Sequence, residues 1–133
     1  MFDLKKIENG RMNVPEPEYY DAKASIEIQI GQALSLQSGV LAPVGGTTKP
    51  EFISLGKLTG SAAKREIPVA RVNDEQVYEV SITAAPTSLK VGNKVTLSSD
   101  GMEVTATTSD GVATIVNLCG AAAAGDKILV KFV

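Results

Sequence analysis

The residues of this 133-residue chain that could do chemistry are carboxylates, lysines and one thiol, because histidine is absent. Histidine is the usual general base near neutral pH and the commonest zinc ligand. Without it, neither a Ser-His-Asp triad nor a Cys-His pair can be built from this chain. We therefore expect a protein that is not an enzyme and that uses no cofactor or metal. Catalysis through carboxylates or a lysine is the alternative.

Three carboxylates stand next to a glycine, at Asp100, Asp110 and Asp126. A glycosidase pair or a calcium site requires at least two carboxylates that converge in a pocket. An aspartate beside a glycine is also the usual composition of a tight turn. We interpret these three residues as turn residues.

The single cysteine, Cys119, lies between Leu118 and Gly120. One cysteine excludes an intrachain disulfide and indicates synthesis in a reducing cytoplasm. A reactive thiol needs neighbours that lower its pKa, and no histidine exists to do so. We expect Cys119 to be a buried structural thiol that packs as a small hydrophobe.

The overall composition argues against two classes of partner. Thirteen basic and 15 acidic residues give a net charge of −2 and form no basic cluster of the kind that nucleic acids attract. The longest apolar runs are far shorter than the roughly 20 residues of a membrane-spanning helix. We expect neither nucleic-acid nor membrane binding.

Alternating hydrophobicity is the main secondary-structure signal. It is clearest at 24–30, where apolar residues occupy every second position, and it resumes at 33–36 after Gly31. Residues 39–50 are rich in Gly, Pro and Thr and are expected to form a loop. The strand-like segment 66–72 contains Pro68, which indicates an edge strand or an initial position in a strand. Further strands are expected at 51–55, 77–83, 95–97, 102–107, 112–116 and 128–133.

The two Asp-Gly turns flanked by strand patterns indicate antiparallel hairpins. Helix propensity is high only at 121–124, which allows one short helical turn near 117–125. The prediction is therefore an all-β protein. Residues 24–133 would form a single small antiparallel barrel or β-clip-like domain of about eight short strands.

Residues 1–23 differ from the rest and are predicted to form an extended N-terminal arm. Asn9-Gly10 is a turn signal, and two prolines within 14–18 restrict the backbone to extended shapes. Such a segment cannot bury its own surface and is suited to docking on a partner. The partner-binding candidates are Val14, Pro15, Pro17, Tyr19 and Tyr20.

The C-terminal run LKVGNKVTLSSDG at 89–101, together with GVATIV at 111–116 and AGDKILVKF at 124–132, resembles the small head-decoration proteins of bacteriophages and prophages. The resemblance implies a β-clip-like domain, homotrimers on a capsid lattice, and an arm that adds a strand to the shell. The implied partner is the major capsid protein or another virion protein. The implied location is the virion, after assembly in the cytoplasm of the host bacterium. Residues 39–65 have no counterpart in that family.

Two other classes of function remain open. Another phage structural role, in a head fibre base, neck or tail, predicts a similar fold with a different docking partner. A ligand- or carbohydrate-binding β module would need exposed aromatic rings along a groove, and only three Tyr and three Phe are available to supply them.

Overall fold

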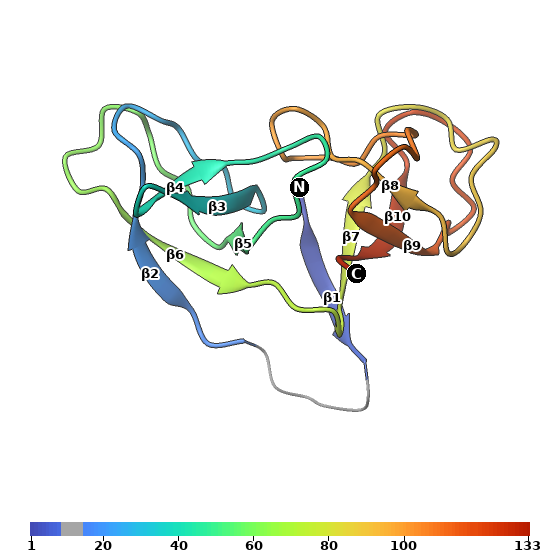
Figure 1. Cartoon of the computed structure of the whole chain (residues 1–133), viewed down its shortest axis with the longest axis horizontal. Helices are drawn as coiled ribbons and strands as arrows, with labels where there is room; N and C mark the ends of the chain where they lie inside the picture. Colours follow the sequence, from blue (N-terminus) through green and yellow to red (C-terminus); the bar gives the residue numbers. More distant parts are fainter. Residues whose placement is uncertain (9–14) are drawn as a thin grey trace.

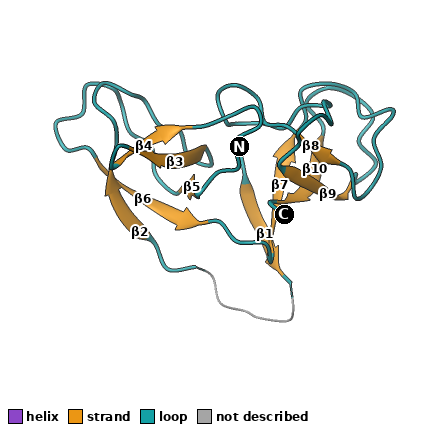
Figure 2. Ribbon diagram, in the orientation of Figure 1, coloured by secondary structure: helices purple, strands orange, loops and turns teal. Residues whose placement is uncertain are grey.

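The computed structural model describes residues 1–8 and 15–133, and these residues form strands, turns and loops without any helix (Figure 2). Ten strands in this described part make two antiparallel sheets of five strands each. Sheet A has the order β1 (Asp3–Ile7), β7 (Gln76–Ser81), β10 (Lys127–Lys131), β9 (Ala113–Asn117) and β8 (Lys94–Val95). Sheet B has the order β2 (Glu18–Asp21), β6 (Glu66–Arg71), β5 (Phe52–Ser54), β3 (Ala33–Gln37) and β4 (Val40–Pro43).

The predicted all-β class is confirmed, but the predicted barrel of about eight strands is wrong. The strands of the described residues number ten, and neither sheet closes into a barrel. In sheet B the two edge strands come close, because Ala22 and Leu41 form an isolated parallel bridge. One bridge is not a ladder, so β2 and β4 stay edge strands.

The two sheets lie side by side, with sheet B on the left and sheet A on the right of Figure 1. The buried side chains form two clusters. The larger one lies mainly on sheet A, where it contains the packed rings Phe2, Tyr78 and Phe132, and it extends to sheet B through residues such as Ala33 and Ile53. The cluster of sheet B is centred on Phe52, with aliphatic neighbours such as Leu34 and Val69.

The order of the strands shows that sheet B is inserted into sheet A. Strands β1 and β7 are hydrogen-bonded neighbours, with Asp3 opposite Glu79. All five strands of sheet B lie between them in the sequence. The chain therefore starts in sheet A, builds sheet B, and returns to complete sheet A.

Residues 1–23 were expected to form an arm separate from the β domain. Of this range the structure describes 1–8 and 15–23, which contribute β1 to sheet A and β2 to sheet B. Phe2 is 2% exposed, and its ring centroid lies 5.3 Å from that of Phe132 and 6.3 Å from that of Tyr78. Full burial of one such side chain stabilises by about 1.5–3 kcal/mol, which favours a packed segment over a free one.

The prediction of a strand at 24–30 is wrong. Ser25 has a φ of 62°, which breaks the pleat, and only Ile28 pairs, in an isolated bridge with Leu58. The Arg65 guanidinium donates to the carbonyl oxygens of Lys23 and Ile26, with Nη2 to oxygen distances of 2.7 and 2.6 Å. Those carbonyl groups cannot then accept hydrogen bonds from a neighbouring strand, and the segment forms turns instead.

Three smaller predictions about the strands also differ from the structure. Residues 40–43, placed in a loop, form β4, and residues 102–107, placed in a strand, contribute only a bridge at Val104. Strand β6 is interior although it contains Pro68. On the β2 side Pro68 is opposite Tyr19, but its carbonyl accepts the Leu55 N–H at 3.0 Å, so its backbone polar groups face β5. The last β5–β6 pair is Ser54 with Val69, so the missing N–H of Pro68 falls beyond that ladder and is not needed.

Glycines allow the two sheets to meet closely. A Cβ on Gly101, whose φ is 70°, would lie 2.3 Å from the Val44 carbonyl oxygen. The Gly101 carbonyl accepts the Ala33 N–H at 2.9 Å, and Leu97 pairs with Gly46 in an isolated bridge. Because Ala33 and Val44 belong to the sheet B half, this turn joins the halves by backbone contact.

We predict that Phe2→Ala costs about 3–5 kcal/mol of the free energy of unfolding, because it leaves a cavity among the rings of sheet A. Val91→Ala is the control, since Val91 is 63% exposed and exposed substitutions usually change stability by no more than about 0.5 kcal/mol. Urea unfolding measures both. Equal, small losses would mean that the N-terminus is not packed as described.

A second pair of variants separates steric fit from backbone strain. Gly101→Ala and Gly39→Ala both place alanine at a positive φ, of 70° and 84°, but a Cβ at Gly39 meets no atom within 4 Å. We expect Gly101→Ala to be the more destabilising of the two, by about 1–3 kcal/mol, because its methyl group overpacks the sheet junction. Thermal unfolding of the two variants tests this, and equal losses would contradict the junction.

Candidate functional site

A cavity of about 300 Å³ lies between the two sheets. Its sheet A wall is formed by Phe2, Leu4 and Tyr78, at β1 and β7. Its sheet B wall is formed by β5 and β6, through residues such as Ile53 and Ala70. In Figure 1, β1 lies on the side of sheet A that faces sheet B. We call this cavity the inter-sheet recess.

The mouth of the recess collects exposed apolar side chains. Met1 is 52%, Ile30 49% and Leu55 45% exposed, and all three line the recess. They are half of the six large hydrophobic side chains that are exposed in the described part of the chain. A gathering of exposed apolar groups around a hollow marks an interaction site, whereas isolated ones need no explanation.

The polar side chains of the recess wall are already bonded within the protein. The Ser54 hydroxyl donates to the Gly56 carbonyl at 2.6 Å, and the Tyr78 hydroxyl donates to Gln76 Oε1 at 2.6 Å. Burial raises the pKa of Tyr78, so its hydroxyl stays protonated. Asp3 forms an ion pair with Lys5 at 2.9 Å. The recess wall therefore suits apolar contact.

The structure brings one of the predicted partner-binding residues to this recess. Pro15 lines it. Pro17 and Tyr19 are exposed elsewhere on the β2 segment, and Tyr20 is half-buried against Phe52, with ring centroids 5.2 Å apart. Val14 lies outside the described residues.

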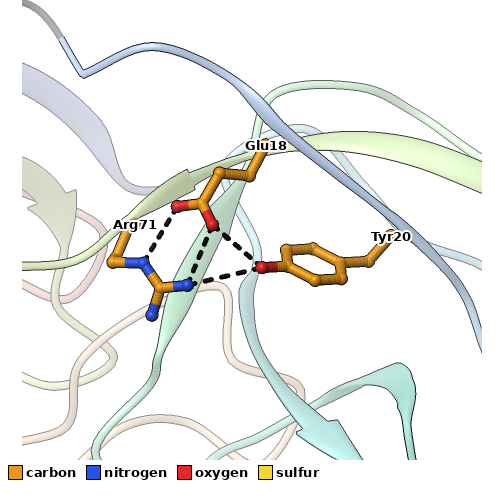
Figure 3. A network of polar contacts seen from close by, with 3 residues as sticks. All are labelled: Glu18, Tyr20 and Arg71. Carbon is orange, nitrogen blue, oxygen red and sulfur yellow. Dashed lines mark hydrogen bonds and ion pairs between the residues drawn. The ribbon is translucent and has the colours of Figure 1, made fainter.

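Tyr20 belongs to a polar cluster that fastens β2 to β6 (Figure 3). Arg71 binds Glu18 through two parallel hydrogen bonds, from Nε and Nη2, each 2.9 Å long. The Tyr20 hydroxyl donates to the same carboxylate at 2.9 Å. The Arg71 guanidinium also lies 4.8 Å from the centroid of the Phe52 ring, a distance at which cation–π attraction operates.

The cluster shifts the titration of its own members. The hydrogen bonds from Arg71, and then from Tyr20, lower the pKa of Glu18 below its ordinary value. The Glu18 carboxylate in turn raises the pKa of Tyr20 and that of Arg71. All three groups are thereby held in the charge state they have at neutral pH, which is the behaviour of a structural fastening and not of a catalytic site.

The prediction that Cys119 is buried is wrong, because the structure places it on the surface. Its φ is 53°, and its N–H donates to Asn117 Oδ1 at 2.7 Å. This turn follows β9 directly, and Cys119 is exposed although its neighbour Leu118 packs against the core. A local side-chain acceptor has decided the geometry of the turn, which neighbouring apolar residues cannot reveal.

Sequence reasoning missed Met1, Ile30 and Leu55 as site residues. A signal existed for Leu55, because it stands two positions after Ile53 and therefore on the same face of an extended segment. Both residues line the recess. Ile30 gave no usable signal, because the alternation around it predicted burial in a strand that does not form.

The described part of the chain, residues 1–8 and 15–133, contains no group of three or more His, Cys, Asp or Glu side chains placed to hold a metal ion. It also has no helix long and apolar enough to span a membrane. No protein-family model matches the chain, and no curated protein matches it. The resemblance to head-decoration proteins therefore stays a hypothesis.

The Glu18 cluster predicts an acid dependence of stability. Because folding lowers the pKa of Glu18 below its ordinary 4.5, its contribution is complete above that pH and is lost as the pH falls through the folded-state value. We expect Glu18→Gln to flatten this loss. Urea midpoints measured from neutral to acid pH test it, with Glu16→Gln as the control, since Glu16 is exposed. Identical pH profiles for Glu18→Gln and the natural chain would contradict the cluster's role.

Proposed function

We propose that this chain is a non-enzymatic phage virion protein, a head-decoration protein that binds and stabilises the capsid. The observation that carries the proposal is the inter-sheet recess, where exposed apolar side chains surround a hollow whose described polar side chains are bonded within the protein. Such a surface takes up apolar side chains of another protein. The resemblance of the C-terminal segments to head-decoration proteins supplies the class of partner, the major capsid protein.

The proposed mechanism is passive. Apolar side chains of a capsid segment enter the recess against Leu55 and Ile30 and are removed from water. Because β1 and β2 are edge strands, an extended capsid segment can also pair with either of them. A protein that binds the assembled shell better than its free subunits stabilises the shell by mass action.

The proposed assembly and location follow the resemblance. Trimers on the capsid lattice would present three recesses to neighbouring capsid subunits, and the protein would be part of the virion after assembly in the bacterial cytoplasm. A role in a head fibre base, neck or tail would use the same recess on a different partner. The virion fraction in which the chain is found distinguishes these locations.

A carbohydrate-binding module is less well supported. Sugar sites use exposed aromatic rings along a groove. Tyr19 is the one exposed aromatic residue among those that the structure describes, and it does not line the recess. The other described rings are buried or half-buried in the two cores.

Rebinding to capsids tests the proposal. Leu55→Asp and Ile30→Asp place a charge in the recess and should weaken binding at least about tenfold, as loss of a buried interface anchor does. Both residues are about half exposed, so the fold should tolerate the change. Val91→Asp is the matched control, because Val91 is 63% exposed and lies away from the recess.

The measurement is co-sedimentation with capsid shells prepared from virions that carry the chain and then stripped of it. Circular dichroism and unfolding midpoints confirm that each variant is folded. Virions that lack the chain altogether, or equal binding of all three variants, would refute the proposal.

A further inference from the structure

The chain contains two Asp-Gly dipeptides, Asp100-Gly101 and Asp110-Gly111, in different surroundings. An Asp-Gly pair can react with itself. The glycine nitrogen attacks Cγ of the protonated aspartate carboxyl group, an N–C bond forms, and water leaves to give a cyclic succinimide. Water then opens the ring at either carbonyl, which yields aspartate or isoaspartate. The water released on ring closure is taken up again on ring opening, so the overall reaction consumes no reagent. Glycine favours the reaction because it has no side chain to obstruct the attack.

At Asp100-Gly101 both reacting groups are held. Asp100 Oδ1 accepts the Ser98 hydroxyl at 2.6 Å and the Met102 N–H at 3.0 Å. The Gly101 N–H donates to the Ser98 carbonyl at 3.0 Å. Gly101 is also buried in the junction between the sheets. Ring closure would have to break these bonds and displace the junction, so local opening must come first.

At Asp110-Gly111 neither reacting group is held by a hydrogen bond. Asp110 is exposed and has a φ of 55°. Within the described residues, its carboxylate and the Gly111 N–H make no hydrogen bond. The next backbone N–H along the chain, that of Val112, does form a hydrogen bond and donates to the Val95 carbonyl at 3.0 Å. No hydrogen bond of either group therefore has to break before the carboxyl group approaches the nitrogen.

We propose that Asp110-Gly111 is a site of spontaneous isoaspartate formation in the folded protein, and that the fold protects Asp100-Gly101 from the same reaction. This inference does not depend on the proposed function. It assigns a modification that changes neither mass nor composition.

The modification would act on the edge of sheet A. Isoaspartate inserts one extra carbon atom into the main chain directly before Gly111. The space there is already filled, since a Cβ on Gly111 would lie 2.3 Å from the Lys94 carbonyl group. Two residues later Ala113 pairs with Val95. We expect the modified chain to lose part of the β8–β9 pairing and to unfold at a lower urea concentration.

The test uses asparagine as a reporter, because an Asn-Gly pair closes the same ring with loss of ammonia and then gains mass on hydrolysis. Asp110→Asn and Asp100→Asn are incubated folded at neutral pH, and deamidation is followed by peptide mapping with mass spectrometry. The Asp100→Asn variant keeps the side-chain oxygen that accepts the bonds from Ser98 and Met102. Mapping also separates Asn9-Gly10, which lies outside the described residues.

We expect deamidation in folded Asp110→Asn to be severalfold faster at position 110 than in folded Asp100→Asn at position 100. In urea the two positions should react at similar rates. In the aged natural chain, enzymatic methylation of isoaspartate should label residue 110 and not residue 100. Equal folded-state rates at the two positions, or faster reaction at position 100, would overturn the proposal. If Asp100→Asn does not fold, the labelling of the natural chain decides by itself.

Discussion

The pairing of β1 with β7, fixed by the burial of Phe2, is the constraint on which the rest of the structure depends. It joins the two ends of a segment that contains the whole of sheet B. Closing so long a loop has an entropic cost that grows slowly with its length. The aromatic contacts of Phe2 with Tyr78 and Phe132 offset that cost at the point of closure. Long-range pairing of this kind also predicts slow folding.

The same closure gives the inter-sheet recess its shape. The Phe2 N–H donates to the Gly31 carbonyl, and the Gly31 N–H donates to the Ser54 carbonyl, each at 2.8 Å. This relay runs from β1 to β5 and fixes the distance between the two walls. Gly31 is required in it, because its φ is 75° and a Cβ would lie 2.8 Å from Met1 Cβ. A recess with fixed walls loses little conformational entropy when a partner enters.

The sequence predicted a strand correctly where a segment of alternating hydrophobicity also pairs with a neighbouring strand. Strands β3, β7, β9 and β10 lie where the period-two pattern placed them. It failed at 24–30, because a remote side chain, Arg65, takes the carbonyl groups that a strand would have used. It also missed the burial of Phe2, since nothing local distinguishes an arm that packs on Tyr78 from one that stays free. The recess combines Leu4, Ile30 and Leu55 from separate segments, so only the fold could reveal it.

Folding alone does not account for the apolar residues at the recess mouth. Ile30 and Leu55 belong to neither of the two buried clusters, although the larger cluster crosses between the sheets through Ala33 and Ile53. Each sheet is small, and a small core leaves little stability to spare. The backbone contacts of Gly101 with Ala33 and Val44 join the halves without help from the recess. Polar residues at positions 30 and 55 would therefore serve the fold equally well, so the reason for apolar ones is to be sought in a partner.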